Sequence, residues 1–157
     1  MWNRDGDLPG TPWHHYRQLA DGLAARGIAT FLFDKGGTGG TGGVESDING
    51  RVIEVRAAMA CAKARTEVGN LVLVGHSAGS AVVVRVGGPM ILLSPVVPPP
   101  AGVLAIQPSS EWIPEWHAVS IPNVTHLLLG PGAAGEATMP ASVIDAVANG
   151  VKSAPQR

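Results

Sequence analysis

The sequence has few charged residues, a single cysteine and no long hydrophobic run, and each of these shortages excludes a class of protein. Charged side chains make up 15% of the 157 residues, and the formal net charge is −1 with no basic or acidic block. Such a chain has no long-range attraction for nucleic acid or for an anionic membrane. No apolar run approaches the ~20 residues that a membrane-spanning helix needs. We therefore expect neither nucleic acid nor a membrane as a partner.

The lone cysteine, Cys61, excludes an internal disulfide, which mildly favours a reducing compartment. Residues 1–15 are polar and contain no secretory signal, so a soluble cytoplasmic protein is expected. A metal site is not expected, because the adjacent His14 and His15 would point to different sides of a helix. We interpret both histidines as surface residues at a helix start and Cys61 as a small core residue. We also expect no cofactor.

What the sequence has in abundance is apolar residues, glycine and proline. Apolar residues reach 45%, which is enough for a folded core in a chain of this length. The length predicts a single domain over residues 1–157. The 21 glycines and 13 prolines predict many turns and short connections.

Hydrophobic patterns predict alternating strands and helices. Strands are expected at residues 28–33, 71–74, 90–93, 103–106 and 118–121, and helices near residues 16–23, 48–62, 78–86 and 141–151. Ser46 or Asp47 can cap the second helix, whose apolar stripe comprises Ile48, Val52, Val55, Met59 and Ala62. The alternation predicts an α/β fold with a mostly parallel sheet of about five strands flanked by helices. Ligands of such sheets bind at the carboxyl ends of the strands.

One motif stands at such a strand end: Gly75-His76-Ser77-Ala78-Gly79 matches the Gly-x-Ser-x-Gly pattern of a nucleophile elbow. There the serine occupies a sharp strand-to-helix turn that holds its hydroxyl clear of the sheet. We take Ser77 as the candidate nucleophile and the amide of Ala78 as a candidate oxyanion donor. The alternative is a purely structural glycine turn. Valines 82–84 disfavour the following helix unless burial against the sheet compensates.

A serine nucleophile needs a histidine base and an acid that orients it. With this elbow the chain order is serine, acid, histidine. Of the two histidines after Ser77, His126 follows a short strand, whereas His117 precedes it, so we assign His126 as the base. Glu111 and Glu115 lie after the preceding strand, and Glu111 is nearer its end, so we assign Glu111 as the acid. The alternative is an ordinary loop histidine with a solvated carboxylate.

Together with this motif, several segments resemble bacterial α/β-hydrolases of the serine esterase type. They are RDGDLPG at residues 4–10, YRQLA at residues 16–20, Phe33-Asp34-Lys35 before a glycine loop, and a late Pro-x-Val-x-His-Leu-Leu segment ending at Leu128. The resemblance covers most of the chain in order. It implies an α/β-hydrolase fold with Ser77 as nucleophile and His126 as base. Glu111 then stands where the family usually has aspartate.

The resemblance also implies segments that this sequence lacks. Such hydrolases carry an upstream strand whose His-Gly loop supplies a second oxyanion donor, and they carry a lid. The expectation is therefore a truncated α/β-hydrolase fold, a trimmed copy or a gene whose start lies upstream. Without the upstream strand, residues 28–33 and 71–74 would have to pair directly or leave a gap. Because one lost oxyanion donor costs about 10²–10³ in turnover, such a chain would be slow and not inactive.

Two other interpretations compete with a working hydrolase. The loop from Gly37 to Gly42 is a literal G-x-G-x-x-G between an expected strand and a helix, which permits a dinucleotide-binding domain. Against this, no strand ending in an acidic residue follows at the required distance. The other interpretation is a catalytically impaired remnant, or a protomer that pairs with a second copy through an exposed sheet edge.

Two further features admit a structural role. We expect Asp34 to order the glycine loop by accepting hydrogen bonds from its amides. Trp112 and Trp116, near Glu111, would either line an acyl pocket or cover core exposed by a shortened loop. The leading hypothesis is a serine hydrolase that cleaves small carboxylic esters through an acyl-enzyme intermediate, without a cofactor.

Overall fold

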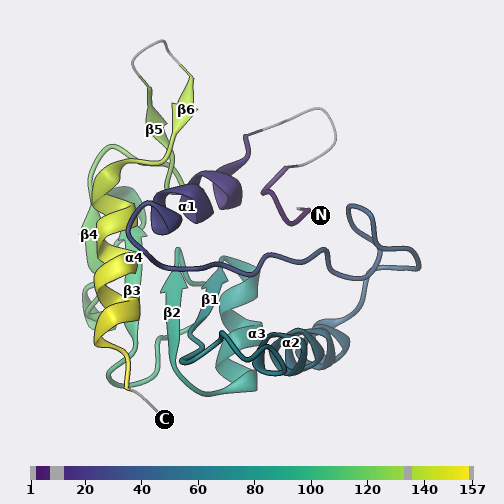
Figure 1. The fold of residues 1–157 in the computed structure, drawn as a ribbon. Coiled ribbons are helices and arrows are strands. Elements are labelled where there is room, and N and C mark those ends of the chain that lie inside the picture. The colour runs from purple at the N-terminus through teal and green to yellow at the C-terminus, as the bar shows by residue number, and fades with distance from the viewer. Residues whose placement is uncertain (1–2, 8–12, 133–135, 156–157) are drawn as a thin grey trace. The chain divides into compact units, whose positions relative to one another are not determined.

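The chain divides into two units, Met1–Leu71 and Val72–Arg157, in the computed structural model (Figure 1). The structure describes residues 3–7, 13–132 and 136–155. Within these residues no helix is both long and apolar enough to cross a membrane. The single domain expected from the sequence stays a prediction.

The first unit contains the two helices that the sequence predicts. Helix α1 (His15–Ala24) buries an apolar stripe that includes Leu19 and Leu23. Helix α2 (Ile48–Lys63) begins after Asp47, whose carboxylate accepts a hydrogen bond of 2.8 Å from the amide of Gly50. This bond satisfies one of the amides that a helix leaves without an internal acceptor. Of the two candidates, Ser46 and Asp47, it is therefore Asp47 that caps the helix.

The prediction of a strand at residues 28–33 is wrong. These residues form no ladder with any described residue, and 54% of the Phe31 side chain is exposed. The apolar composition of the run was the basis of the expectation, but a strand exists only where a neighbour completes its hydrogen bonds. Here the run is an extended connection between α1 and the glycine loop.

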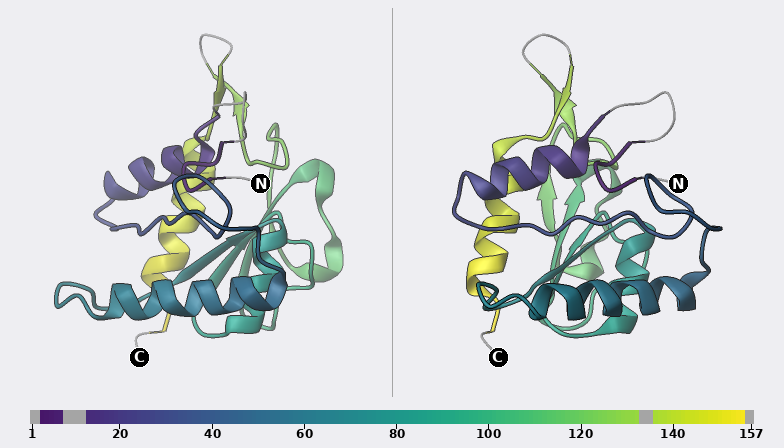
Figure 2. Two further views of the ribbon diagram at one scale, coloured as in Figure 1. Left: turned by 90° about the vertical axis from the view of Figure 1, so that its right-hand side faces the viewer. Right: turned by 45° about the vertical axis from the view of Figure 1, so that its right-hand side comes forward.

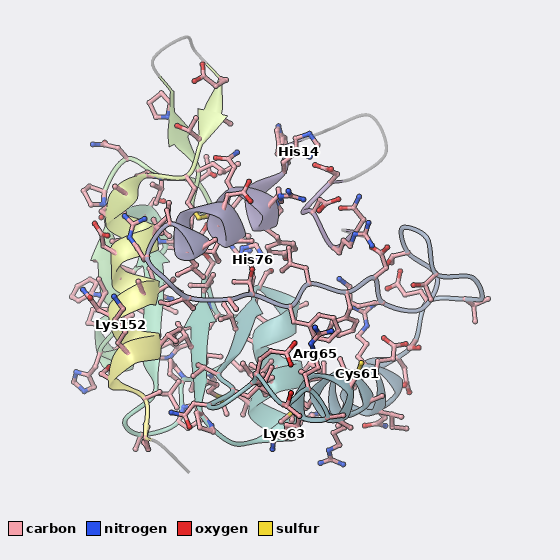
Figure 3. All side chains as sticks on the ribbon, in the orientation of Figure 1. His14, Cys61, Lys63, Arg65, His76 and Lys152 are labelled. Carbon is pink, nitrogen blue, oxygen red and sulfur yellow. The ribbon has the colours of Figure 1, made fainter. Side chains whose placement is uncertain are left out.

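Two side chains of the first unit also differ from expectation. His15 is buried, with 1% of its surface exposed, whereas its neighbour His14 is exposed and pairs with Asp7 at 2.8 Å. Cys61 is exposed on α2 and not part of the core (Figure 3). His14 precedes α1 and His15 is its first residue, so the two histidines lie in different surroundings, and Cys61 lies on a part of α2 that stays exposed.

The second unit is built on a parallel sheet of four strands, one fewer than the approximate five expected. The strands are β1 (Leu73–His76), β2 (Met90–Leu93), β3 (Leu104–Pro108) and β4 (Val119–Ile121), in the order β1-β2-β3-β4. Each pairs in parallel with its neighbour. The expected strands are therefore present, with ends displaced by up to two residues, and β1 is one edge of the sheet.

Helices α3 (Ala78–Val86) and α4 (Ala141–Ser153) cover opposite faces of this sheet (Figures 1 and 2). Val83 of α3 clusters with Leu92 and Ala105, which are paired neighbours on one face. Gly150 of α4 lies against Ile91 and Leu104, the preceding pair, which points to the other face. The β-branched residues of α3 are thus tolerated because Val83 is buried against the sheet and the partly buried Val84 packs against the same cluster.

A parallel sheet brings the carboxyl ends of all four strands to one edge. The chain segments that follow there are the turn into α3, the loop after β2, and two short helical turns after β3, η1 (Ser109–Glu111) and η2 (Pro114–Trp116). The loop after β4 comes next, followed by the two-stranded ribbon of β5 (Gly130–Pro131) and β6 (Ala137–Thr138). The predicted site residues all belong to these segments.

Candidate active site

Ser77 occupies the turn between β1 and α3 in a backbone conformation that residues other than glycine rarely adopt. Its φ is 51° and its ψ is −123°. The amide of Ser77 donates to the carbonyl of Leu93 at 2.9 Å, which ties the turn to the end of β2. Its carbonyl accepts from the amide of Ser80 at 2.9 Å and from the Ser80 hydroxyl at 2.6 Å. These bonds offset the strain of the turn, which has the geometry of a nucleophile elbow.

His126 reaches Ser77 from the loop that follows β4. Its Nε2 lies 2.8 Å from Ser77 Oγ, although 49 residues separate the two in the sequence. The loop is closed by two hydrogen bonds of 2.8 Å, from Leu128 N to Thr125 O and from Thr125 N to Leu129 O. Leu128 is buried and holds a φ of 58°, so the turn is anchored by its apolar side chain.

Glu111 approaches the opposite nitrogen of the same imidazole. It ends η1, directly after β3, and its Oε2 lies 2.7 Å from His126 Nδ1. A carboxylate can only accept, so Nδ1 carries the proton and Nε2 is left with a lone pair that accepts from the Ser77 hydroxyl. The arrangement can remove a proton from Ser77 and stabilise the imidazolium that results.

Ala78 is the first residue of α3, immediately after Ser77. The first amides of a helix have no acceptor within the helix, and the helix dipole adds partial positive charge at the same end. The amide of Ala78 is therefore suited to hold negative charge that develops beside Ser77. Its role as an oxyanion donor stays a prediction.

The other histidine and glutamate considered as base and acid lie away from Ser77. His117 precedes β4, at the far end of that strand from His126, and Glu115 is exposed on η2. Trp112 is 47% exposed, which does not fit a side chain that covers the core. A contact of either tryptophan with an acyl group stays a prediction.

Sequence reasoning missed three buried side chains that support this site: His76, Ser80 and Ser94. Ser80 Oγ bridges two segments, because it donates to the Ser77 carbonyl and accepts from the amide of Val96 at 3.1 Å. His76 Nε2 and Ser94 Oγ both contact the carbonyl oxygen of His126. The position of His76 inside the motif was the one available signal, but the motif itself sets no residue there.

The glycine loop of the first unit does not fit dinucleotide binding. No strand precedes it among the described residues, and four of the six amides from Gly37 to Gly42 are already bonded within the loop segment. These bonds run from Gly37 N to Gly42 O, Thr38 N to Lys35 O, Gly40 N to Asp34 Oδ2 and Thr41 N to Thr38 O. Amides satisfied in this way are not available to a pyrophosphate.

Asp34 orders this loop, as expected. Besides the amide of Gly40, its carboxylate accepts from the amide of Arg4 at 2.8 Å. These two backbone donors, with Gly40 the stronger, hold the pKa of Asp34 below its ordinary value.

With the geometry established, residues 11–132 match the family described as serine aminopeptidase, S33. The chain belongs to this family. It is therefore an α/β-hydrolase, in agreement with the parallel sheet and with the resemblance carried by the motifs. Comparison with curated proteins and with solved structures finds no match. Membership of the S33 family thus establishes a hydrolase but not the bond that this α/β-hydrolase cleaves.

Proposed function

We propose that this α/β-hydrolase is a serine esterase that cleaves carboxylic esters of small acyl groups through an acyl-enzyme intermediate. The observation that carries the proposal is the continuous hydrogen-bonded chain from Glu111 Oε2 through the imidazole of His126 to Ser77 Oγ, with distances of 2.7 and 2.8 Å. Both distances allow proton transfer without rearrangement.

In acylation, His126 Nε2 takes the hydroxyl proton as Ser77 Oγ attacks the ester carbonyl carbon. The carbonyl electrons move to oxygen, and the Ala78 amide donates to this oxyanion. When the carbonyl re-forms, the bond to the alkoxide breaks, and the alkoxide leaves as alcohol with the proton from Nε2. Deacylation repeats the sequence with water as nucleophile and the serine oxygen as leaving group. Glu111 keeps Nδ1 protonated throughout.

The family description names an aminopeptidase, so a peptide bond is the second candidate substrate. Both reactions use the same acyl-enzyme chemistry. An ester is the less demanding of the two, because an alkoxide is expelled more readily than an amine. An assay with an aminoacyl p-nitroanilide beside p-nitrophenyl esters separates the two candidates.

The test measures hydrolysis of p-nitrophenyl acetate and butyrate by the wild-type chain, Ser77→Ala and His126→Ala, with fluorophosphonate labelling of each. Ser77→Ala keeps a Cβ, so the backbone strain at its φ of 51° is unchanged. We expect both variants to lose about 10³-fold or more in turnover, and Ser77→Ala to lose labelling. Ser153→Ala and His117→Asn are the matched controls, because both residues are exposed and outside the site.

If a folded wild-type chain neither labels nor exceeds Ser77→Ala in turnover, the esterase proposal fails. A catalytically impaired remnant, or a protomer that needs a second copy at its sheet edge, then takes its place. Measurement of the molar mass in solution distinguishes these two outcomes. The cytoplasmic location stays a prediction.

A further inference from the structure

The main-chain carbonyl oxygen of His126 is held by two side chains. His76 Nε2 lies 2.9 Å from it and Ser94 Oγ lies 2.8 Å from it. A carbonyl oxygen has two lone pairs, so both are used. Because this oxygen can only accept, Nε2 of His76 must carry a proton. The backbone of His126 is therefore fixed at the residue whose ring contacts Ser77.

Both donors come from the carboxyl ends of neighbouring strands. His76 is the last residue of β1 (Figure 3), and Ser94 directly follows β2, one residue beyond the strand partner of His76. Both side chains are buried, with 8% and 1% exposed. Ser94 has a φ of 40°, a strained value for serine, and its amide donates to Ile106 of β3 at 2.8 Å. Strain retained at a buried polar residue indicates a functional constraint.

His76 has a second connection to the same pair, because it is joined to Ser77 by the peptide bond. Its backbone thus carries the nucleophile, while its ring holds the backbone of the base. The rings of His76 and His126 lie with centroids 5.4 Å apart at an angle of 45°. His76 therefore links the position of Ser77 Oγ to that of His126 Nε2, although 49 residues separate Ser77 from His126 in the chain.

We propose that His76, together with Ser94, is a positioning residue that holds His126 against Ser77 by binding its carbonyl oxygen. This inference rests on the proposed function for its effect on turnover, but not for the hydrogen bonds themselves. His76 exchanges no proton with the substrate. Its contribution is to keep the distance between base and nucleophile short enough for reaction.

The test compares His76→Ala, His76→Gln and the control His117→Asn in ester hydrolysis, with thermal unfolding to confirm that each variant is folded. We expect His76→Ala to lower kcat by about 10- to 100-fold with little change in KM, because geometry and not ground-state binding is lost. His76→Gln retains an amide donor and should recover part of kcat. Wild-type kcat in folded His76→Ala overturns the proposal.

Ser94→Gly provides an independent variant, since glycine removes the hydroxyl and also accepts the φ of 40° without strain. It should lower kcat in the same direction as His76→Ala. The effects of the double variant should not be additive, because both donors act on one oxygen atom. If the loss of kcat in the double variant equals the product of the two single losses, a shared role of His76 and Ser94 is contradicted.

A nuclear magnetic resonance measurement on the ¹⁵N-labelled chain separates failure of this proposal from failure of the esterase proposal. It needs no turnover. In the wild-type chain we expect the His126 Nδ1 proton to resonate at low field, and the His76 ring to be protonated at Nε2. In His76→Ala the low-field signal should broaden or exchange faster. An unchanged His126 signal overturns the proposal even in an active esterase.

Discussion

A methyl group of Val83 occupies the space that a side chain on Gly75 would need. A Cβ built on Gly75 lies 2.5 Å from Val83 Cγ2, 2.8 Å from the carbonyl oxygen of Gly79 and 3.0 Å from the Cα of Ser80. Two of these three atoms are backbone and cannot rotate away. A Cβ on Gly79, the other glycine of the motif, meets nothing within 4 Å. Packing therefore requires a glycine at position 75 of the Gly-x-Ser-x-Gly motif but not at position 79.

This difference predicts unequal effects of the same substitution. Gly75→Ala should lower the free energy of unfolding by about 1–3 kcal/mol, because the strand and α3 must move apart. Gly79→Ala, inside α3, should be neutral or stabilise by up to about 1 kcal/mol through helix propensity. Urea denaturation of both variants measures the difference. Equal losses in the two variants would show that packing of the first glycine is not the cause.

Ser80 should matter for stability although it contacts no substrate. Ser80→Ala removes a donor to the Ser77 carbonyl and leaves the amide of Val96 without the acceptor at 3.1 Å. A hydrogen bond contributes about 0.5–1.5 kcal/mol to stability, and this change removes two, so the midpoint of urea unfolding should fall accordingly. Ser153→Ala, at the exposed end of α4, is the matched control. A loss no greater than that of the control contradicts the bridging role.

Glu111→Gln should reduce kcat by about 10³- to 10⁴-fold if the esterase proposal holds, because a neutral amide no longer keeps His126 in the required tautomer. Glu115→Gln makes the same chemical change at an exposed position on the adjacent η2 turn and should leave kcat near that of the wild type. Steady-state kinetics on p-nitrophenyl butyrate compare the two. A larger loss in Glu115→Gln would reassign the acid.

Stability should depend on pH through His15. Burial lowers the pKa of His15 from 6.5 to about 4 in the folded chain. The unfolded chain therefore binds this proton more readily, so the free energy of unfolding falls as the pH drops from about 6.5 to 4. The linkage limits this contribution to about 3 kcal/mol. Urea denaturation across this range should show a weaker pH dependence in His15→Phe, with His117→Asn unchanged from wild type. Identical slopes in His15→Phe and the wild-type chain would contradict the prediction.

Local pattern was sufficient for most elements of the second unit. The helix expected at residues 78–86 is α3 with the same ends, and the strand expected at residues 90–93 is β2. These segments combine a marked apolar run or turn with neighbours that agree with it. The run at residues 28–33 had the same composition, yet no strand forms there, because ladder hydrogen bonds require a partner that composition does not reveal.

The sequence by itself determined the sharp turn at Ser77, the alternation of strands and helices, and the order in which Ser77, Glu111 and His126 follow one another. Each of these depends on interactions among residues close in the chain. Only the tertiary structure decided that Glu111 and not Glu115 faces His126, and that His76 and Ser94 hold its carbonyl oxygen. Those contacts join residues 15 to 50 positions apart. Their distances are set by the register of parallel strands and by the turns at the strand ends, which no local pattern specifies.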